Sequence, residues 1–313
     1  MRFARLRLKL MSNTENRRGP RQSWALLKSH LTSRIKGQDE VLSRLTAAVL
    51  RCELVAVPPR GCRSCFFFAG PTGVGKTATA LALEDFVFGG KRLARFDCSE
   101  FKTLDSVTGL LGNRGKDRGR FGQAYSQASE GVWLFDEIEK AHPEFVHLFL
   151  QMTDAGRLTL ASGQTLDLSG LYIIVTSNLG SAEILGREHL PFTSLERHVV
   201  RSIQRHLRPE LLGRFGAPFV FRPLTRAVQA EIVRLNLGEL LEWQAEKQGR
   251  QIICERDVEE FLLQMGFSTR LGARPLQDTL RELVGNAIVD ELIAGQNGSG
   301  RLAVADHRLN LFP

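Results

Sequence analysis

Eight consecutive residues of this chain could bind a chain of phosphate groups. The stretch reads Gly70-Pro71-Thr72-Gly73-Val74-Gly75-Lys76-Thr77 and fits the pattern G-x-x-x-x-G-K-[ST] at every fixed position. Glycines let backbone N–H groups come close to phosphates, Lys76 adds a positive charge, and the hydroxyl of Thr77 can bind Mg²⁺. A plain glycine-rich turn would not need Gly75, Lys76 and Thr77 in this order. The stretch therefore predicts a nucleotide-binding site.

Two carboxylates follow an apolar stretch further along the chain. Residues 131–137 read Gly-Val-Trp-Leu-Phe-Asp-Glu, which predicts a buried parallel strand ending in Asp136 and Glu137. In an open parallel sheet, ligands bind at the carboxyl ends of the strands. We therefore expect both carboxylates near the γ-phosphate of a nucleotide held by residues 70–77. The alternative for Glu137 is an ion pair with Lys140 on the helix that follows.

The elements that must position these residues alternate between strand and helix. Strands are predicted at 65–69, 93–97, 131–137, 171–176 and 218–221, with helices between them. The pattern predicts an α/β fold, a parallel five-stranded sheet with flanking helices. Beyond Pro223, a small mixed α/β domain is predicted from helices at 225–248, 257–265 and 275–294 and from strands at 251–254 and 301–304.

The length of 313 residues suits one large domain and a smaller one. We expect a basic, disordered tail over 1–22, a nucleotide-binding domain over 23–223 and a small domain over 224–313. Ser23 is predicted to cap the first helix. Most of the net charge of +8 lies in the tail, which holds seven basic residues and one acidic residue. The charge is thus mainly a property of the tail and does not by itself indicate binding to nucleic acid.

Composition also argues against several classes of protein. No apolar run approaches the length of a transmembrane helix, and the N-terminus lacks the apolar core of a signal peptide, so we expect a cytoplasmic protein. The five cysteines are scattered and do not suggest a disulfide framework. Cys62 and Cys65 form a lone C-x-x-C pair, which we expect to be buried or in a loop rather than to bind zinc or perform redox chemistry.

The segment 112–122 is rich in glycine and positive charge. Four glycines and four basic residues predict a mobile, exposed loop instead of a helix or strand. The side chains that the loop could present to a partner are Arg114, Lys116, Arg118, Arg120 and the aromatic Phe121.

Six stretches together resemble a known family. They read GPTGVGKT, VWLFDEIEKAHPEF, DAGRLTLASGQT, IIVTSNLGS, RPELLGRF and GARPLQ. In order and approximate spacing they are similar to the second ATPase module of the Clp chaperone ATPases, members of the AAA+ superfamily, from about Ile35 to the C-terminus. The resemblance implies ATP and Mg²⁺ as cofactors, an AAA+ large domain with a small lid domain, a homohexameric ring, and remodelling or threading of a protein substrate.

The resemblance also implies roles for single residues. Asp136 would hold Mg²⁺ together with Thr77. Glu137 would orient and deprotonate the attacking water. Asn178 matches the sensor-one asparagine, which reaches the γ-phosphate, although it could instead be a turn residue at a strand end.

Further roles belong to residues nearer the termini. Arg214 matches the arginine finger, which acts in the site of a neighbouring subunit, and Arg208 is the competing candidate. Arg274 matches sensor two, which couples the small domain to the nucleotide of its own subunit. Ile35, with Gly37 and Gln38, matches the segment that packs on adenine, with a plain helix cap as the alternative.

The sequence departs from the family in three ways. It is expected to be a stand-alone module, without the amino-terminal domain, first ATPase module and coiled-coil insert of the family. Residues 181–200 contain no Ile-Gly-Phe/Leu tripeptide for docking a protease; Ile184-Leu185-Gly186 is the nearest. The pore loop of the family, with a tyrosine between glycines, is replaced by the basic segment 113–122.

Three functions are compatible with these features. The first is an ATP-driven ring that remodels or threads a protein, which the resemblance favours. The second is a ring acting on nucleic acid or a nucleoprotein, such as a loader or transposition-type factor, which the basic loop and tail favour. The third is an ATP-switched scaffold without translocation, which the missing pore tyrosine favours.

Overall fold

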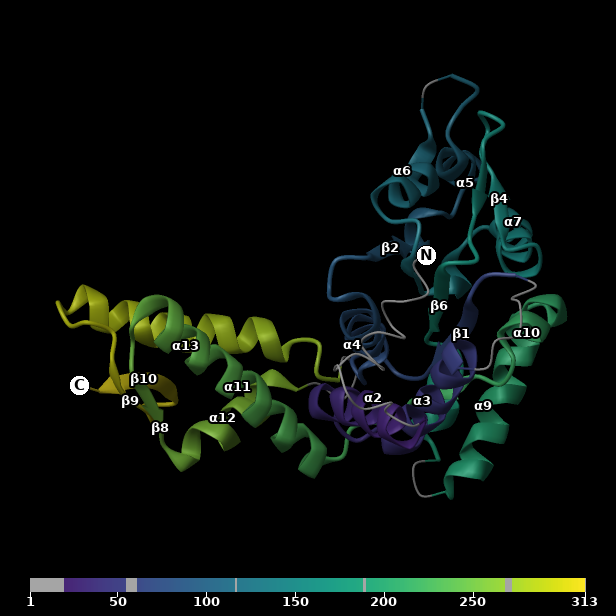
Figure 1. The fold of residues 1–313 in the computed structure, drawn as a ribbon. Helices are drawn as coiled ribbons and strands as arrows, with labels where there is room; N and C mark the ends of the chain where they lie inside the picture. The colour runs from purple at the N-terminus through teal and green to yellow at the C-terminus, as the bar shows by residue number, and fades with distance from the viewer. Residues whose placement is uncertain (1–19, 55–60, 116, 188–189, 268–271, 313) are drawn as a thin grey trace. The chain divides into compact units, whose positions relative to one another are not determined.

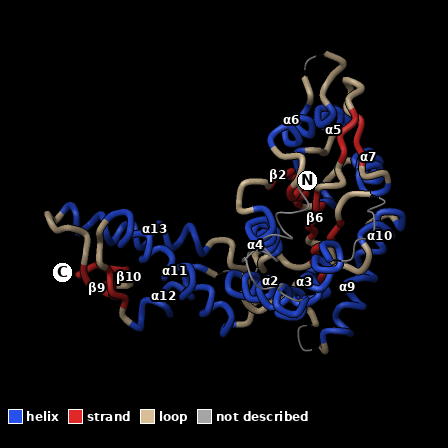
Figure 2. The backbone as a smooth tube through the Cα atoms, in the orientation of Figure 1, coloured by secondary structure: helices blue, strands red, loops and turns tan. Residues whose placement is uncertain are grey.

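The computed structural model of the chain describes residues 20–54, 61–115, 117–187, 190–267 and 272–312. Within these residues the chain forms two compact units that meet in the sequence between Arg222 and Pro223. Thr72–Val74 is grouped with the second unit. Figure 1 labels many of the elements of both units, and Figure 2 colours the backbone by secondary structure.

A parallel sheet of five strands is the centre of the first unit. Its strands lie in the order β2-β3-β6-β1-β7, and every neighbouring pair is parallel. The strands are β1 (Ser64–Ala69), β2 (Leu93–Asp97), β3 (Gly131–Asp136), β6 (Leu171–Ser177) and β7 (Phe219–Val220). A separate antiparallel pair consists of β4 (Arg157–Thr159) and β5 (Thr165–Asp167). The predicted fold class is confirmed.

Helices connect these strands. The helices of the first unit are α2 (Pro20–Arg34), α3 (Asp39–Leu54), α4 (Lys76–Phe88), α5 (Leu104–Leu111), α6 (Gly119–Gln127), α7 (Pro143–Asp154), α8 (Ser181–Leu185), α9 (Phe192–His206) and α10 (Pro209–Phe215). Two short 3₁₀ helices, η1 (Cys98–Glu100) and η2 (Ile138–Lys140), follow β2 and β3. η1 begins directly after β2, and Glu137 alone separates η2 from β3, so the residues at the carboxyl edge of these strands lie next to regular structure on both sides.

Aromatic side chains line both faces of the sheet, because successive residues of a strand point to opposite faces. On one face Phe67 of β1 stacks on Phe215 of α10, with 5.0 Å between ring centroids. On the other face Phe66 of β1 stacks on Tyr172 of β6 at 5.9 Å, and Phe88 of α4 contacts the same tyrosine at 6.2 Å. Burial of such large apolar groups holds the helices against the sheet and thereby fixes its carboxyl edge.

The second unit has its own core. Its elements are α11 (Arg226–Gln248), β8 (Ile252–Cys254), α12 (Arg256–Gly266), α13 (Leu276–Ile293), β9 (Gly300–Ala305) and β10 (Arg308–Phe312). The three strands form one sheet in the order β10-β9-β8. Buried side chains from all three helices and both longer strands meet in one cluster, which includes Leu237, Leu262, Val284, Leu302 and Leu311. The unit is the small mixed domain that the sequence predicts.

The first helix begins earlier than predicted. Residues 20–22, assigned to the tail, belong to α2, and Ser23 lies inside the helix at 2% exposure instead of capping it. Proline suits the first turn of a helix because its φ is already helical and it has no N–H to satisfy. Residues 1–19, the rest of the predicted tail, lie outside the described residues.

Strand β10 is not predicted from the sequence. It pairs with β9 through a two-residue turn at Asp306 and His307, whose φ values are +52° and +58°. Two positive φ values are typical of type I′ hairpin turns, which usually contain glycine or asparagine. The dipeptide Asp-His gives no such signal.

No helix of the described residues is long and apolar enough to cross a membrane. The five cysteines are free thiols. Burial raises the pKa of Cys62 to about 12 and that of Cys65 well above its ordinary value. Because the thiolate is the reactive and metal-binding form, these raised pKa values disfavour redox and zinc chemistry at Cys62 and Cys65.

Candidate functional site

The predicted phosphate-binding loop connects β1 to α4. Gly70 and Gly75 have φ values of +146° and +107°. A Cβ atom on Gly70 would lie 2.6 Å from the carbonyl oxygen of Phe221, and one on Gly75 would lie 3.3 Å from Cγ2 of Ile35. Both positions therefore favour glycine. No side chain caps the start of α4 at Gly75, so the first N–H groups of this helix suit an anionic ligand.

Lys76 is held within this loop. The residue is 8% exposed, and its Nζ donates hydrogen bonds to the carbonyl oxygens of Gly70 at 2.5 Å and Pro71 at 2.7 Å. Nζ also donates to Oδ1 of Asn178 at 3.0 Å. The ammonium group thus joins the loop to the carboxyl end of β6.

The two predicted metal ligands lie together. Oγ1 of Thr77 donates to Oδ1 of Asp136 at 3.3 Å. Oγ1 of Thr176, on β6, donates to the same oxygen at 2.8 Å, and Nε of Arg95, on β2, donates to Oδ2 at 2.6 Å. Hydroxyl and carboxylate oxygens are the ligands that Mg²⁺ prefers in proteins, so Thr77 and Asp136 fit this ion.

Glu137 has an unusual backbone conformation. Its φ of +56° and ψ of +54° lie in the left-handed region, which is costly for a residue other than glycine and is frequent at active sites. Its Oε1 accepts a hydrogen bond from Nδ2 of Asn178 at 3.0 Å. Lys140 is 3.9 Å from Oε2, too far for a hydrogen bond. Glu137 thus forms the ion pair with Lys140 that the sequence offers as an alternative, in addition to the stronger contact with Asn178.

Asn178 follows β6 and bridges the two charged residues of the site. Its Oδ1 accepts from Lys76, and its Nδ2 donates to Glu137. Its backbone N–H donates to Oε1 of Glu139 at 3.0 Å. The two side-chain contacts fix the amide, including which end is oxygen and which is nitrogen, because each end faces a partner of one kind.

The segment predicted to pack on adenine lies against the loop. Ile35 is 6% exposed and contacts Gly75, and Gly37 has a φ of +72°. The Gln38 side chain pairs with the backbone of Arg222: its Nε2 donates to the carbonyl oxygen at 2.9 Å, and its Oε1 accepts from the N–H at 3.0 Å. This amide pair fastens the segment to the last residue of the first unit.

The three arginines predicted from the resemblance lie on different elements. Arg214 is on α10, and its Nε is 2.6 Å from Oδ1 of Asp154 at the end of α7. Arg208 is the exposed N-cap residue of the same helix. Arg274 is an exposed residue of the second unit, two residues before α13. The roles of all three arginines stay predictions.

The basic segment 112–122 differs from the predicted mobile loop. Gly119 to Gly122 belong to α6, and before this helix the N–H of Asn113 donates to the carbonyl oxygen of Asp117 at 3.2 Å. Phe121 is fully buried and stacks on Trp133 of β3 at 5.3 Å. The prediction that Phe121 contacts a partner is therefore wrong, because its ring is part of the core.

The basic side chains of this segment are not equivalent. Arg120 pairs with Glu100 at 2.5 Å and lies over the ring of Phe101 at 5.1 Å, so it is tied to the fold. Arg118 is exposed and donates to Ser126 at 3.0 Å. Arg114 is exposed, and Lys116 lies outside the described residues. Partner contact by Arg114, Lys116, Arg118 and Arg120 stays a prediction, and the structure favours it least for Arg120, whose guanidinium already pairs with Glu100.

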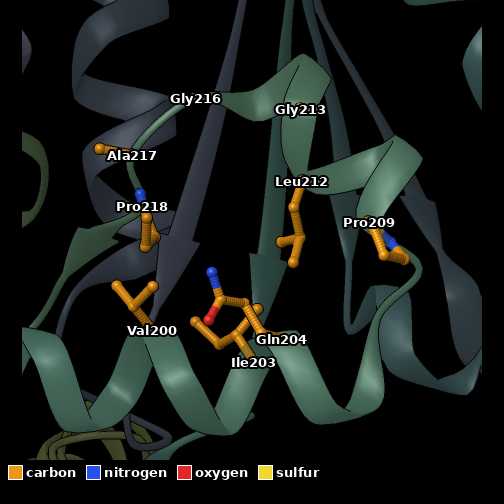
Figure 3. A pocket seen from close by; sticks show the side chains of 9 residues that line it. All are labelled: Val200, Ile203, Gln204, Pro209, Leu212, Gly213, Gly216, Ala217 and Pro218. Atoms are coloured by element: carbon orange, nitrogen blue, oxygen red, sulfur yellow. The ribbon is translucent and has the colours of Figure 1, made fainter.

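A cavity of about 540 Å³ lies between α9 and α10. Figure 3 shows the side chains that line it, which come from Val200, Ile203, Gln204, Pro209, Leu212, Gly213, Gly216, Ala217 and Pro218. The lining is mostly apolar and contains no charged side chain, and no predicted site residue contributes to it. Phosphates need cations and N–H donors, so this cavity is not the nucleotide site.

Three residues of the site are missed by the sequence analysis. Arg95 and Thr176 bind Asp136, and Glu139 binds the backbone of Asn178. Each contact joins elements far apart in the chain. A cation or hydroxyl on a neighbouring strand is a signal only when the order of strands in the sheet is known.

Comparison with known proteins agrees with this geometry. The family model described as "AAA domain (Cdc48 subfamily)" matches residues 63–217, and the "C-terminal, D2-small domain, of ClpB protein" matches residues 224–304. The two matches cover most of both units. The predicted resemblance to an AAA+ module of Clp type is confirmed.

Similar curated proteins are chaperones of the same kind. The chain is 34% identical over 297 residues to chaperone protein ClpC3, chloroplastic, of Oryza sativa subsp. japonica, covering 90% of this chain and 32% of that protein. It is 33% identical over 299 residues to chaperone protein ClpB of Aquifex aeolicus, covering 90% and 29%. The chain thus spans about a third of the length of these relatives.

Solved structures show the same fold. The S. cerevisiae Hsp104–ADP complex matches with a TM-score of 0.84 and 28% sequence identity over 99% of this chain and 55% of that chain. A closed state of Hsp104 with ATPγS and FITC casein matches with a TM-score of 0.83 and 28% identity, over 100% and 55%. This chain therefore belongs to the AAA+ ATPases, and its two units resemble the second ATPase module of Clp chaperones.

Proposed function

We propose that this chain hydrolyses ATP with Mg²⁺ in a homohexameric ring and uses the energy to remodel or thread a protein partner. The observation that carries the proposal is the convergence of Lys76, Thr77, Asp136, Glu137 and Asn178 through direct hydrogen bonds at one edge of the sheet. This set contains a cation for phosphates, oxygen ligands for Mg²⁺ and a carboxylate for a water molecule.

Each residue has a chemical task in this proposal. Lys76 and the first N–H groups of α4 would bind the phosphates, and Mg²⁺, held by Thr77 and Asp136, would neutralise their charge. Glu137 would accept a proton from the attacking water, in the position that Asn178 gives it. Arg214 of a neighbouring subunit would stabilise the charge that develops in the transition state.

Two features support a ring acting on protein. Among the described residues, Arg214 forms its one ion pair with Asp154. This pair lies outside the network of Lys76 and Glu137, which suits a role of Arg214 in another subunit. The similar proteins are named chaperones, and one similar structure contains casein. Arg274 would then report on the nucleotide within each subunit, and Ile35 would contact its base.

Nucleotide binding by the Lys76→Ala protein tests the first step of this proposal. Loss of Lys76 should weaken ATP binding by about tenfold or more for each charged phosphate contact that is lost. Fluorescent-nucleotide titration measures the affinity, and thermal unfolding checks that the fold is retained. The matched control is Lys91→Ala, an exposed lysine just beyond α4. Equal affinity of both variants for ATP would contradict the assignment of the phosphate loop.

The basic segment 112–122 is the feature that we propose contacts the partner. Arg114, Lys116 and Arg118 would place a ring of positive charge in the central pore, which attracts acidic peptides or the nucleic-acid backbone. Changing these three residues to serine should leave basal ATP hydrolysis intact and abolish its stimulation by a partner. The single change Arg120→Ser is the control, because Arg120 pairs with Glu100 instead.

The same measurement separates the two kinds of partner. Stimulation by unfolded protein supports remodelling, whereas stimulation by DNA, with an affinity that falls steeply as salt rises, supports a ring acting on nucleic acid. If partners stimulate ATP hydrolysis by the triple variant as they do for the unchanged protein, the basic segment 112–122 does not contact them. A switch without translocation is then the better interpretation.

A further inference from the structure

Asp136 has a cationic partner that the predicted mechanism does not use. Nε of Arg95 donates to Oδ2 of Asp136 at 2.6 Å. Arg95 lies on β2, the strand next to β3, and its side chain is 51% exposed, whereas that of Asp136 is 7% exposed. A nearly buried carboxylate thus has a half-exposed guanidinium as its counter-ion.

The two oxygens of this carboxylate have different surroundings. Oδ1 accepts from Thr176 at 2.8 Å and from Thr77 at 3.3 Å, while Oδ2 accepts from Arg95. Thr176 is 2% exposed and belongs to a strand with buried residues throughout, so its hydroxyl is a fixed donor. Thr176 therefore sets the orientation of Asp136, with Oδ1 towards Thr77. What Arg95 adds is positive charge.

We propose that Arg95 weakens the binding of Mg²⁺ at Asp136 by neutralising part of its charge, while Thr176 orients the carboxylate for the ion. The inference rests on the proposed function, in which Thr77 and Asp136 hold Mg²⁺. A cation bonded to one oxygen of a carboxylate repels a second cation at the other, and this repulsion is strong where little water screens it. In this role Arg95 bonds to Asp136 and not to the ion or the nucleotide, so it is not a catalytic residue.

The surrounding charges explain why such a residue is useful. Asp136, Glu137 and Glu139 place three carboxylates within four residues of one another. A nearly buried carboxylate without a partner is costly, so Arg95 stabilises Asp136 when no Mg²⁺ is bound. A moderate affinity also lets Mg²⁺ leave with the product after each cycle. Arg95 thus lowers the affinity for Mg²⁺, stabilises Asp136 when the ion is absent and eases release of the ion.

The test compares ADP affinity with and without Mg²⁺, which measures binding of the ion without hydrolysis. The quantity compared is a ratio, the dissociation constant for ADP without Mg²⁺ divided by that with Mg²⁺, and it is determined with a fluorescent ADP analogue. Arg95→Gln should raise this ratio by about tenfold, the effect of removing one unit charge near the ion. Thr176→Val should lower it by about 10–100-fold, as expected when a carboxylate loses the group that orients it. The matched control Arg92→Gln removes a cation that pairs with Glu130 and should leave the ratio unchanged.

Three further measurements test this effect of charge. Salt should reduce the difference between Arg95→Gln and the unchanged protein, because the guanidinium is half exposed and ions screen it. Arg95→Lys, which keeps the charge, should restore most of the original ratio. In thermal unfolding, Mg²⁺ with ADP should stabilise Arg95→Gln more than it stabilises the unchanged protein.

An unchanged or lower ratio for Arg95→Gln overturns the inference, because the guanidinium would then be neutral for the ion or would help to bind it. A ratio near one for the unchanged protein has another meaning. It would contradict the metal site of Thr77 and Asp136, and so the proposed function itself.

Discussion

The Glu137→Gln protein should bind ATP as tightly as the unchanged protein and hydrolyse it about 10²–10⁴-fold more slowly, the range for loss of a general base. Glutamine has the size and shape of glutamate and can still bond to Asn178, but it cannot accept a proton from water. The φ of +56° at this position is held by its surroundings, so the substitution should not relax the backbone. Steady-state phosphate release and nucleotide titration measure the two quantities.

A neighbouring carboxylate is the control for this experiment. Glu144→Gln, in the exposed first turn of α7, changes the net charge by the same amount and should hydrolyse ATP at the normal rate. Hydrolysis by Glu137→Gln at the rate of this control would show that Glu137 does not activate the water. Glu139 would not be a suitable control, because its Oε1 holds the backbone of Asn178.

Subunits with Arg214→Ala should bind ATP normally and hydrolyse it about 10³–10⁵-fold more slowly, as expected for a missing arginine finger. The change also breaks the ion pair with Asp154, in which both side chains are partly exposed at 50% and 39%. An exposed pair of this kind contributes about 0–1 kcal/mol to stability, so the fold should persist. The rate of hydrolysis per subunit and the melting temperature check both points.

Asp154→Asn distinguishes a finger from a structural ion pair. If Arg214 acts in a neighbouring site, loss of its partner within the subunit should leave hydrolysis at the normal rate or raise it, because the guanidinium is released. If Asp154→Asn is as slow as Arg214→Ala, the pair itself is what hydrolysis needs. A normal rate for Arg214→Ala together with a slow Arg208→Ala would assign the finger to Arg208.

Mixed rings test whether the site is shared between subunits. Arg214→Ala subunits keep Glu137, and Glu137→Gln subunits keep Arg214, so some interfaces in a mixture contain both groups. Activity should therefore recover when the two inactive proteins are mixed and allowed to exchange subunits. Mixtures that exchange subunits and stay inactive would place the arginine in the site of its own subunit.

Local sequence determines the parts of the site that lie within one strand, turn and helix. The loop from Gly70 to Thr77 follows an apolar strand and opens a helix, and its glycines and Lys76 have their roles from this local geometry. Asp136 ends another apolar strand, and Glu137 follows it directly. Because carboxyl ends of parallel strands lie at one edge, their proximity to the loop could be predicted before the strand order was known.

Tertiary packing overrides local preference at Phe121. Glycines at 119 and 122 and the neighbouring basic residues predict a loop, since glycine is a poor helix former. In the structure Phe121 stacks on Trp133, and burial of this ring stabilises the helix that presents it. The penalty for the glycines is about 1 kcal/mol each, which burial of one aromatic side chain offsets.

The order of strands in the sheet decides which distant residues meet, and local sequence patterns do not predict this order. Arg95 reaches Asp136 because β2 lies beside β3, and Thr176 reaches it because β6 lies on the other side. Gln38 pairs with Arg222, 184 residues away. The sequence alone therefore determines the nucleotide chemistry of this protein, because that chemistry lies in contiguous motifs. Only the tertiary structure shows which cation and hydroxyl act on Asp136, because side chains from different strands come together only when the sheet forms.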